Sequence, residues 1–245
     1  DLAASAEQFA RGRHGADLRY DLTVPFVEAA FGTKTEVSFA RSERCDACKG
    51  TGAQKGAGRK LCPSCGGTGQ VRRNSGFFSI AQVCQHCGGD GEIVERPCAA
   101  CGGAGTVRRK RTLTVVIPAG TEDGRRIAVS GEGDAGPNGA PPGDLYVVVR
   151  VQSHEYFERQ GADLYCAVPI SIAQAALGAE ISLPTLDGRT VLVTVRPGTQ
   201  HGSMLRLRGE GVPQDGPGAH RGDLYVKVLL RVPERLTGKA KELLK

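Results

Sequence analysis

Eight of the nine cysteines in this 245-residue chain fall into four copies of one motif, CxxCxGxG. Its eight cysteines are Cys45 and Cys48, Cys62 and Cys65, Cys84 and Cys87, and Cys98 and Cys101. Two residues between cysteines let both sulfurs of one turn face the same metal ion, and the glycines permit the positive φ that curls the backbone around it. The four copies therefore predict two structural Zn²⁺ sites, each closed by four thiolates.

The four motifs can pair in three ways, and the stretches between them are 13, 18 and 10 residues long. The middle stretch fits best the usual zinc spacing of about 15–20 residues between two CxxC pairs. Spacing therefore favours joining the second motif with the third and the first with the fourth, without excluding the other pairings. The two sites would then be Cys62, Cys65, Cys84 and Cys87, and Cys45, Cys48, Cys98 and Cys101.

Other chemistries of cysteine fit the sequence less well. A disulfide framework is typical of secreted chains, and no signal peptide is visible. A CxxC thiol-disulfide oxidoreductase usually places its motif near a βαβ unit, which the sequence does not show. The ninth cysteine, Cys166, lies in an alternating apolar run and is predicted to be a small buried residue. The reduced state that zinc thiolates need, without a targeting signal or a membrane-length apolar run, predicts a cytoplasmic protein.

An alternative function is that of a zinc-dependent nucleic-acid-binding protein, which would need a strongly positive charge. The formal net charge is +6, and many of the basic residues surround the cysteines. Each Zn²⁺ held by four thiolates carries about two negative charges, so the loaded chain would lie near +2. Aromatic residues, which stack on bases, are scarce at 5%. Nucleic acid is therefore an alternative partner that charge and composition make unlikely.

A second repeat lies outside the cysteines and predicts a duplicated domain. The segment 117–124 resembles 195–202, and both copies continue through Gly-Glu-Gly to Gly-Asp-Leu-Tyr-Val. Alternating apolar residues predict mainly β structure, with two homologous small β-sandwich or barrel-like domains in tandem and the two-zinc domain inserted in the first. The expected divisions are 1–14 as linker remnant, 15–44 plus 106–151 as β-domain I, 45–105 as the cysteine-rich zinc domain, 152–234 as β-domain II, and 235–245 as the truncated start of a C-terminal helix.

Local patterns predict the individual elements. Strands are expected at Leu18–Val24, Glu36–Phe39, Leu113–Ile117, Ile127–Val129, Leu145–Val151, Leu164–Ile170, Val191–Val195, Leu205–Leu207 and Leu224–Val232. Short helices are expected at Val27–Phe31 and Ile172–Leu177, each followed by glycine, and after Thr237 through Leu243 and Leu244. No catalytic constellation is visible, and Asp144 and Asp223 recur before equivalent strands, which indicates turn roles. We therefore expect a protein that is not an enzyme.

The order of these parts resembles the C-terminal portion of the type I (class A) Hsp40 co-chaperone family, which includes bacterial DnaJ. The resemblance rests on four CxxCxGxG motifs inside the first of two related β-domains, followed by Val-Pro-Glu-Arg-Leu-Thr before a helix. It implies the same zinc pairing that the spacing favours. The J-domain with its His-Pro-Asp tripeptide and the glycine/phenylalanine linker do not occur in this sequence. The C-terminal helix, which supports homodimerisation in the family, is short here, so we expect dimer formation to be impaired.

The resemblance also implies a function. Members of the family bind unfolded polypeptides through an apolar groove and a strand edge, prevent aggregation, and deliver clients to Hsp70 (DnaK). The client-binding positions that it implies are Leu18, Val37, Phe39, Leu113 and Phe157. From the residues alone, alternating Val37 and Phe39 are more typical of a core than of a groove. In the family the site of Cys62, Cys65, Cys84 and Cys87 cooperates with Hsp70, whereas the other site is more structural.

Overall fold

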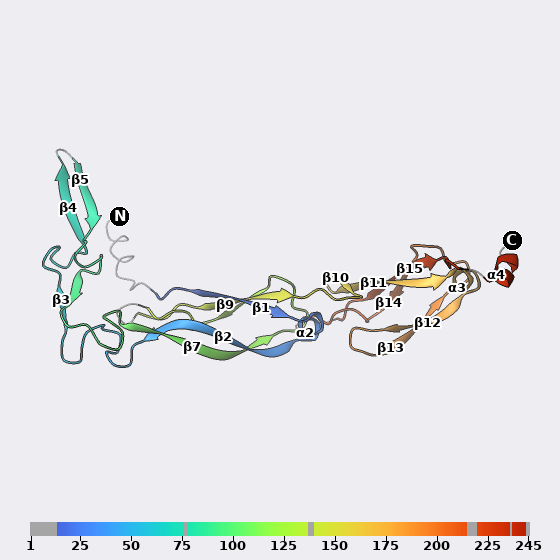
Figure 1. Ribbon diagram of the computed structural model, residues 1–245, viewed down its shortest axis with the longest axis horizontal. Coiled ribbons are helices and arrows are strands. Elements are labelled where there is room, and N and C mark those ends of the chain that lie inside the picture. The colour runs from blue at the N-terminus through green and yellow to red at the C-terminus, as the bar shows by residue number, and fades with distance from the viewer. Residues whose placement is uncertain (1–13, 76–77, 137–139, 215–219, 236, 244–245) are drawn as a thin grey trace. The chain divides into compact units, whose positions relative to one another are not determined.

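The computed structural model of the chain describes residues 14–75, 78–136, 140–214, 220–235 and 237–243 (Figure 1). All but His14 of the expected linker remnant, and Leu244 at the expected C-terminal helix, lie outside these residues. The described chain is mainly β, as predicted. Among the described residues, no helix has the length and apolar character needed to cross a membrane.

The first copy of the duplicated domain combines a three-stranded sheet, in the order β1-β9-β8, with a two-stranded sheet of β2 and β7. Its elements are β1 (Leu18–Val24), α2 (Phe26–Phe31), β2 (Thr33–Arg44), β7 (Thr106–Ile117), β8 (Arg126–Val129) and β9 (Leu145–Val151). The predicted bounds of β1 and β9 are confirmed, because apolar residues recur at every second position along both strands. Strands β2 and β7 are longer than predicted, since their outer halves are polar and carry no apolar alternation.

The second copy repeats this plan without the insertion. A four-stranded sheet, in the order β10-β11-β15-β14, accompanies the two-stranded sheet of β12 and β13. Its elements are β10 (Glu158–Gln160), β11 (Asp163–Ser171), α3 (Ile172–Leu177), β12 (Ala179–Pro184), β13 (Thr190–Val195), β14 (Met204–Leu207) and β15 (Leu224–Arg231), followed by α4 (Gly238–Leu243). Helix α3 has the predicted bounds, and Ser171 and Gln174 form a capping box at its start.

Equivalent hydrogen bonds in the two copies confirm the duplication. Asp144 accepts the amide of Gly131 at 2.8 Å, and Asp223 accepts that of Gly209 at the same distance. The carbonyl of Asp144 accepts from Leu18, and that of Asp223 from Leu164. The two aspartates therefore hold a turn and the start of a strand, as the sequence analysis predicted.

The cysteine-rich insertion contains two short antiparallel pairs that the sequence analysis did not predict. Strand β3 (Arg59–Leu61) pairs with β6 (Glu92–Val94), and β4 (Gln70–Ser75) pairs with β5 (Phe78–Val83). The buried cluster recorded in the described part of this region consists of Cys45, Cys48 and Cys98, with Cys101 and Val107 packed against it. Thiol groups thus take the place that apolar side chains hold in an ordinary core.

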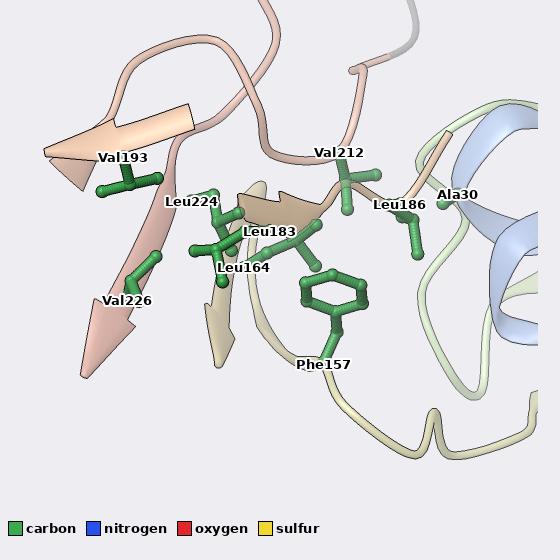
Figure 2. Close-up of a cluster of buried hydrophobic side chains, with 9 residues drawn as sticks. All are labelled: Ala30, Phe157, Leu164, Leu183, Leu186, Val193, Val212, Leu224 and Val226. Atoms are coloured by element: carbon green, nitrogen blue, oxygen red, sulfur yellow. The ribbon is translucent and has the colours of Figure 1, made fainter. Parts of the chain in front are cut away.

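The described chain divides into two compact units. One comprises the described residues of Asp1–Tyr20, Val37–Leu113 and Arg126–Val147, and the other Asp21–Glu36, Thr114–Arg125 and the described residues of Val148–Lys245. The division runs across β1, β2, β7 and β9, so the second unit contains α2 as well as the second copy. Its main buried cluster joins Ala30 of α2 to Phe157, Leu186 and Val212 (Figure 2).

Candidate metal centres

The structure gathers the eight motif cysteines into two groups of four. Within each group the sulfur atoms all lie within 4.8 Å of one another. The groups are Cys45, Cys48, Cys98 and Cys101, and Cys62, Cys65, Cys84 and Cys87. This is the nested arrangement of the four motifs. Either group could hold a metal ion.

The sulfur separations fit a tetrahedral ion better than disulfides. The sulfurs of Cys48 and Cys101 are 3.7 Å apart, while those of Cys62 and Cys84, and of Cys65 and Cys87, are 3.8 Å apart. Four sulfurs about 2.3 Å from a central Zn²⁺ at tetrahedral angles would lie about 3.8 Å from each other. A disulfide would require about 2.05 Å, and all nine cysteines are free thiols.

Main-chain hydrogen bonds join the motifs in reciprocal pairs. Cys45 donates its amide to the carbonyl of Gly105, and Cys98 donates to Gly52, at 2.9 and 2.8 Å. The inner pair repeats this exchange, with Cys62 donating to Gly91 at 2.8 Å and Cys84 to Gly69 at 2.9 Å. Each motif therefore binds its partner through the backbone, and these bonds fix which four sulfurs converge.

The last glycine of each motif is required by this pairing. Gly52, with φ of 73°, faces the carbonyl of Gly103, and Gly105, with φ of 75°, faces that of Gly50. A Cβ atom at either glycine would overlap the carbonyl oxygen opposite it. Gly69 and Gly91 meet the inner partner motif in the same way. The glycine tail thus serves close approach between motifs as well as the local turn.

Hydrogen bonding favours thiolate at several of these sulfurs. Burial opposes ionisation of Cys48, but donation from the backbone of Gly52 and Gly50 outweighs it and lowers the pKa to about 7. The pKa of Cys65 is lowered to about 7 by the same balance, with Gly69 and Gly67 as donors. Cys62 is the most enclosed, and burial raises its pKa to about 11. Gly91 and Gly105 also donate to the sulfurs of Cys87 and Cys101, at 3.3 Å.

Cys166 differs from the other cysteines. It lies on β11, half-buried against the core cluster of the second copy, and belongs to neither group of four. Burial raises the pKa of its thiol to about 11. Its surroundings make it a packing residue, although it is half-buried and not fully buried as predicted.

Of the five predicted client-binding residues, three are buried and two are half-buried. Val37 and Phe39 share the buried face of β2 and are 0% and 9% exposed, and Phe157 is 6% exposed in the core cluster of the second unit. Leu18 and Leu113 are half-buried. Val37, Phe39 and Phe157 are therefore buried in this conformation, and their part in client binding stays a prediction.

Among the described residues, no second strand pairs with the outer edge of β2. Within the described part of the chain, β7 is the one strand paired with β2. At Ser42 the outer edge is occupied, since its amide donates to Asp134 at 2.6 Å and its carbonyl accepts from Ala135 at 2.8 Å. Because backbone groups alternate in direction along a strand, those of Ala40 and Ser38 face the same outer side.

Comparison with known proteins agrees with the geometry. The family model of the DnaJ C-terminal domain matches residues 13–233. This chain belongs to the DnaJ family. Chaperone protein DnaJ of Treponema denticola is 50% identical over 95% of the chain, that of Rhizobium meliloti 48% over 94%, and that of Psychrobacter arcticus 48% over 96%. The chain covers 62%, 60% and 62% of these three DnaJ proteins.

The basic residues of this DnaJ-family chain have partners that the charge argument did not foresee. Arg41 binds Glu132 at 2.7 Å and Glu43 at 3.0 Å, and Arg109 binds Asp46 at 2.7 Å. These ion pairs hold the base of the cysteine-rich insertion together. The arginines are therefore balanced by carboxylates as well as by thiolates. Sequence reasoning missed Glu132, although its place in the repeated Gly-Glu-Gly segment was a usable signal.

Proposed function

We propose that this chain is the polypeptide-binding part of an Hsp40 co-chaperone and that it captures unfolded segments by strand addition along the outer edge of β2. The observation that carries the proposal is the unpaired edge of β2 in a chain whose relatives are named chaperone protein DnaJ. An added strand gains main-chain hydrogen bonds whatever its sequence, which suits a protein that must bind many unfolded chains.

The side chains around β2 support addition at its middle. The hydroxyls of Ser38 and Thr112 lie 2.7 Å apart across β2 and β7. Such close side chains are typical of a non-hydrogen-bonded pair, whose backbone groups point away from each other. The amide and carbonyl of Ser38 are thus directed to the free edge, and those of Ala40 follow the same alternation. The half-buried Leu18 and Leu113 offer apolar surface to client side chains.

The two four-cysteine groups each bind one Zn²⁺ in this proposal. The ions hold the paired motifs together in a region with too few apolar residues for a core, so their role is structural. Binding of unfolded chains limits aggregation, and in a whole protein with a J-domain the client would pass to Hsp70 (DnaK). The group of Cys62, Cys65, Cys84 and Cys87 assists that transfer.

The alternative functions gain no support from the geometry. A thiol-disulfide oxidoreductase joins the two sulfurs of one CxxC, whereas here sulfurs of different motifs converge in fours. Carboxylates engage three basic residues of this region, Arg41, Arg109 and Lys60, which reduces the positive charge available to phosphates.

The proposal is tested by blocking the edge without changing the core. Ala40 is exposed, and Ala40→Pro removes an outward amide while leaving the ladder to β7 in place. The matched control is Ala40→Val, which adds bulk but keeps the amide. We expect fluorescence anisotropy with a labelled, permanently unfolded polypeptide to show binding at least about tenfold weaker for Ala40→Pro than for Ala40→Val.

Zinc content and circular dichroism must match between the two variants for this comparison to count. Equal affinity of the two variants would overturn strand addition at β2. Absence of binding by the unaltered chain would overturn the proposal that it captures clients by itself.

A further inference from the structure

Arg159 binds a turn of the first copy from within the second. Its side chain, 14% exposed, extends from β10. Its Nη1 donates to the carbonyl of Thr121 at 2.7 Å and its Nη2 to that of Gly120 at 2.8 Å. Its Nε donates to the carbonyl of Gly161 at 2.6 Å, which holds the guanidinium to its own hairpin. Two carbonyls of one copy are thus capped by a single side chain of the other.

The capped turn is itself fixed to α2 and lies against the second copy. The amide of Gly120 donates to Ala30 at 2.9 Å, and that of Thr121 donates to Ala29 at 3.1 Å. Thr121 is fully buried. A Cβ atom at Gly120 would come within 2.7 Å of the carbonyl oxygen of Pro213. The two backbones therefore approach as closely as a glycine allows.

Apolar packing surrounds this contact on the same unit of the structure. Ala30 packs in the cluster that contains Phe157 and Leu186 (Figure 2). Arg221 lies over the ring of Phe31, 5.7 Å from its centroid. The ring of His154 packs at a tilt against those of Phe26 and Phe157, with ring centroids 5.4 and 5.0 Å apart. The joint between the copies is thus a packed core with a polar contact at Arg159.

The second copy contains the same turn without this cap. There Thr199 donates its amide to Ala175 at 3.1 Å, as Thr121 does to Ala29. The carbonyl of Gly198 accepts from the side chain of Gln200 at 3.0 Å, within its own turn. The hydrogen bonds within the turn are therefore common to both copies, whereas the contact from Arg159 is a feature of the joint between them.

We infer that Arg159 is a latch that locks the turn 118–122 of the first copy onto the second copy, so that this turn and the second copy move as one body. Without the guanidinium, the carbonyls of Gly120 and Thr121 would lose the charged donors that contact them, which is costly at the fully buried Thr121. This inference does not depend on client binding or on zinc.

Amide hydrogen exchange followed by NMR tests the latch. We expect Arg159→Ala to speed exchange at Gly120 and Thr121 by about tenfold or more, and Arg159→Lys, which retains a charge but loses the fork, by less. The amides of Gly198 and Thr199 are the internal reference and should not change. Arg150→Ala is the matched control, because Arg150 is 49% exposed and makes ion pairs of 3.6 and 3.7 Å with Asp21 and Asp123.

Two results would overturn the inference. Unchanged protection of Gly120 and Thr121 in Arg159→Ala would show that apolar packing alone holds the joint. Equal loss of protection at the turns of both copies would show that Arg159 supports general stability and is not a latch.

Discussion

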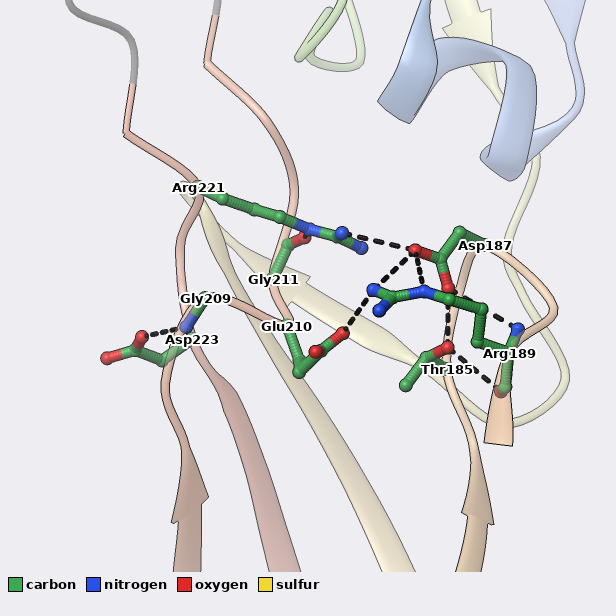
Figure 3. Close-up of polar contacts among 8 residues, drawn as sticks. All are labelled: Thr185, Asp187, Arg189, Gly209, Glu210, Gly211, Arg221 and Asp223. Atoms are coloured by element: carbon green, nitrogen blue, oxygen red, sulfur yellow. Dashed lines mark hydrogen bonds and ion pairs between the residues drawn. The ribbon is translucent and has the colours of Figure 1, made fainter. Parts of the chain in front are cut away.

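Glu132 and Glu210 are equivalent residues of the two copies, and each binds an arginine of the adjacent two-stranded sheet or its hairpin. Glu132 contacts Arg41 on β2 at 2.7 Å, and Glu210 contacts Arg189, just before β13, at 3.0 Å (Figure 3). In the second copy the ion pair secures a tight turn. In the first copy the same position secures the base of the cysteine-rich insertion. The insertion of the first copy therefore lies where the second copy has a turn, and an equivalent ion pair holds both places.

Removing Glu132 should weaken that base. Arg41 is 14% exposed and Glu132 27% exposed, so their bond is partly shielded from water. We expect Glu132→Ala to lower the free energy of unfolding by about 1–2 kcal/mol in urea titration. Glu95→Ala, which breaks the exposed pair with Lys60, is the control and should cost less than about 1 kcal/mol. Equal effects would contradict a bracing role for Glu132.

Metal content should follow the two groups of four. Cys65→Ser removes one ligand of the inner group, so the ratio of zinc to protein by atomic emission should fall from about two to about one. Cys166→Ser should leave the ratio unchanged, since Cys166 lies in neither group. Loss of both ions from Cys65→Ser would show that the two groups depend on each other.

Acid should release the metal. Zinc binds thiolate, and the pKa values of Cys48 and Cys65 lie at about 7 in the metal-free chain. Protons therefore compete increasingly as the pH falls below 7, by up to about four protons per ion. A chromogenic chelator should record faster zinc release at each lower pH, with loss of ordered structure in the insertion. A release rate independent of pH would contradict thiolate ligation.

Asp187 should stabilise the second copy in a pH-dependent way. Its carboxylate accepts from Arg189 at 2.9 Å, from Thr185 at 2.5 Å and from Arg221 at 3.1 Å (Figure 3). These donors, Arg189 first, hold the pKa of Asp187 far below its usual range. The stabilisation is therefore present above the unfolded pKa of about 3.9 and is lost as the pH falls through the lower folded value.

The matching experiment compares Asp187→Asn with the unaltered chain in urea at several pH values. We expect the variant to be less stable by about 1–3 kcal/mol at pH 7, with the difference shrinking below about pH 4. A difference that stays constant from neutral to acid pH would assign the effect to shape and not to charge.

Local patterns of apolar residues in the sequence predicted most of the secondary structure. Leu18–Val24 and Leu145–Val151 were predictable to the residue because alternation marks strands with one buried face. Strand β12 was missed, although Glu180, Ile181, Ser182 and Leu183 alternate, because a proline ends the run. Strands β3 and β6 of the cysteine-rich insertion were missed because each has three residues, too few to show a period.

The sequence by itself determined the four cysteine motifs and the duplication, since both are repeats of residue types that can be read along the chain. Tertiary structure alone decided that the amides of Cys45 and Cys98 reach each other's motifs, that Val37 and Phe39 are covered, and that Arg159 caps a turn of the other copy. Alternation shows which side chains share a face of a strand. What covers that face is set by segments far away in the chain, and local spacing holds no information about them.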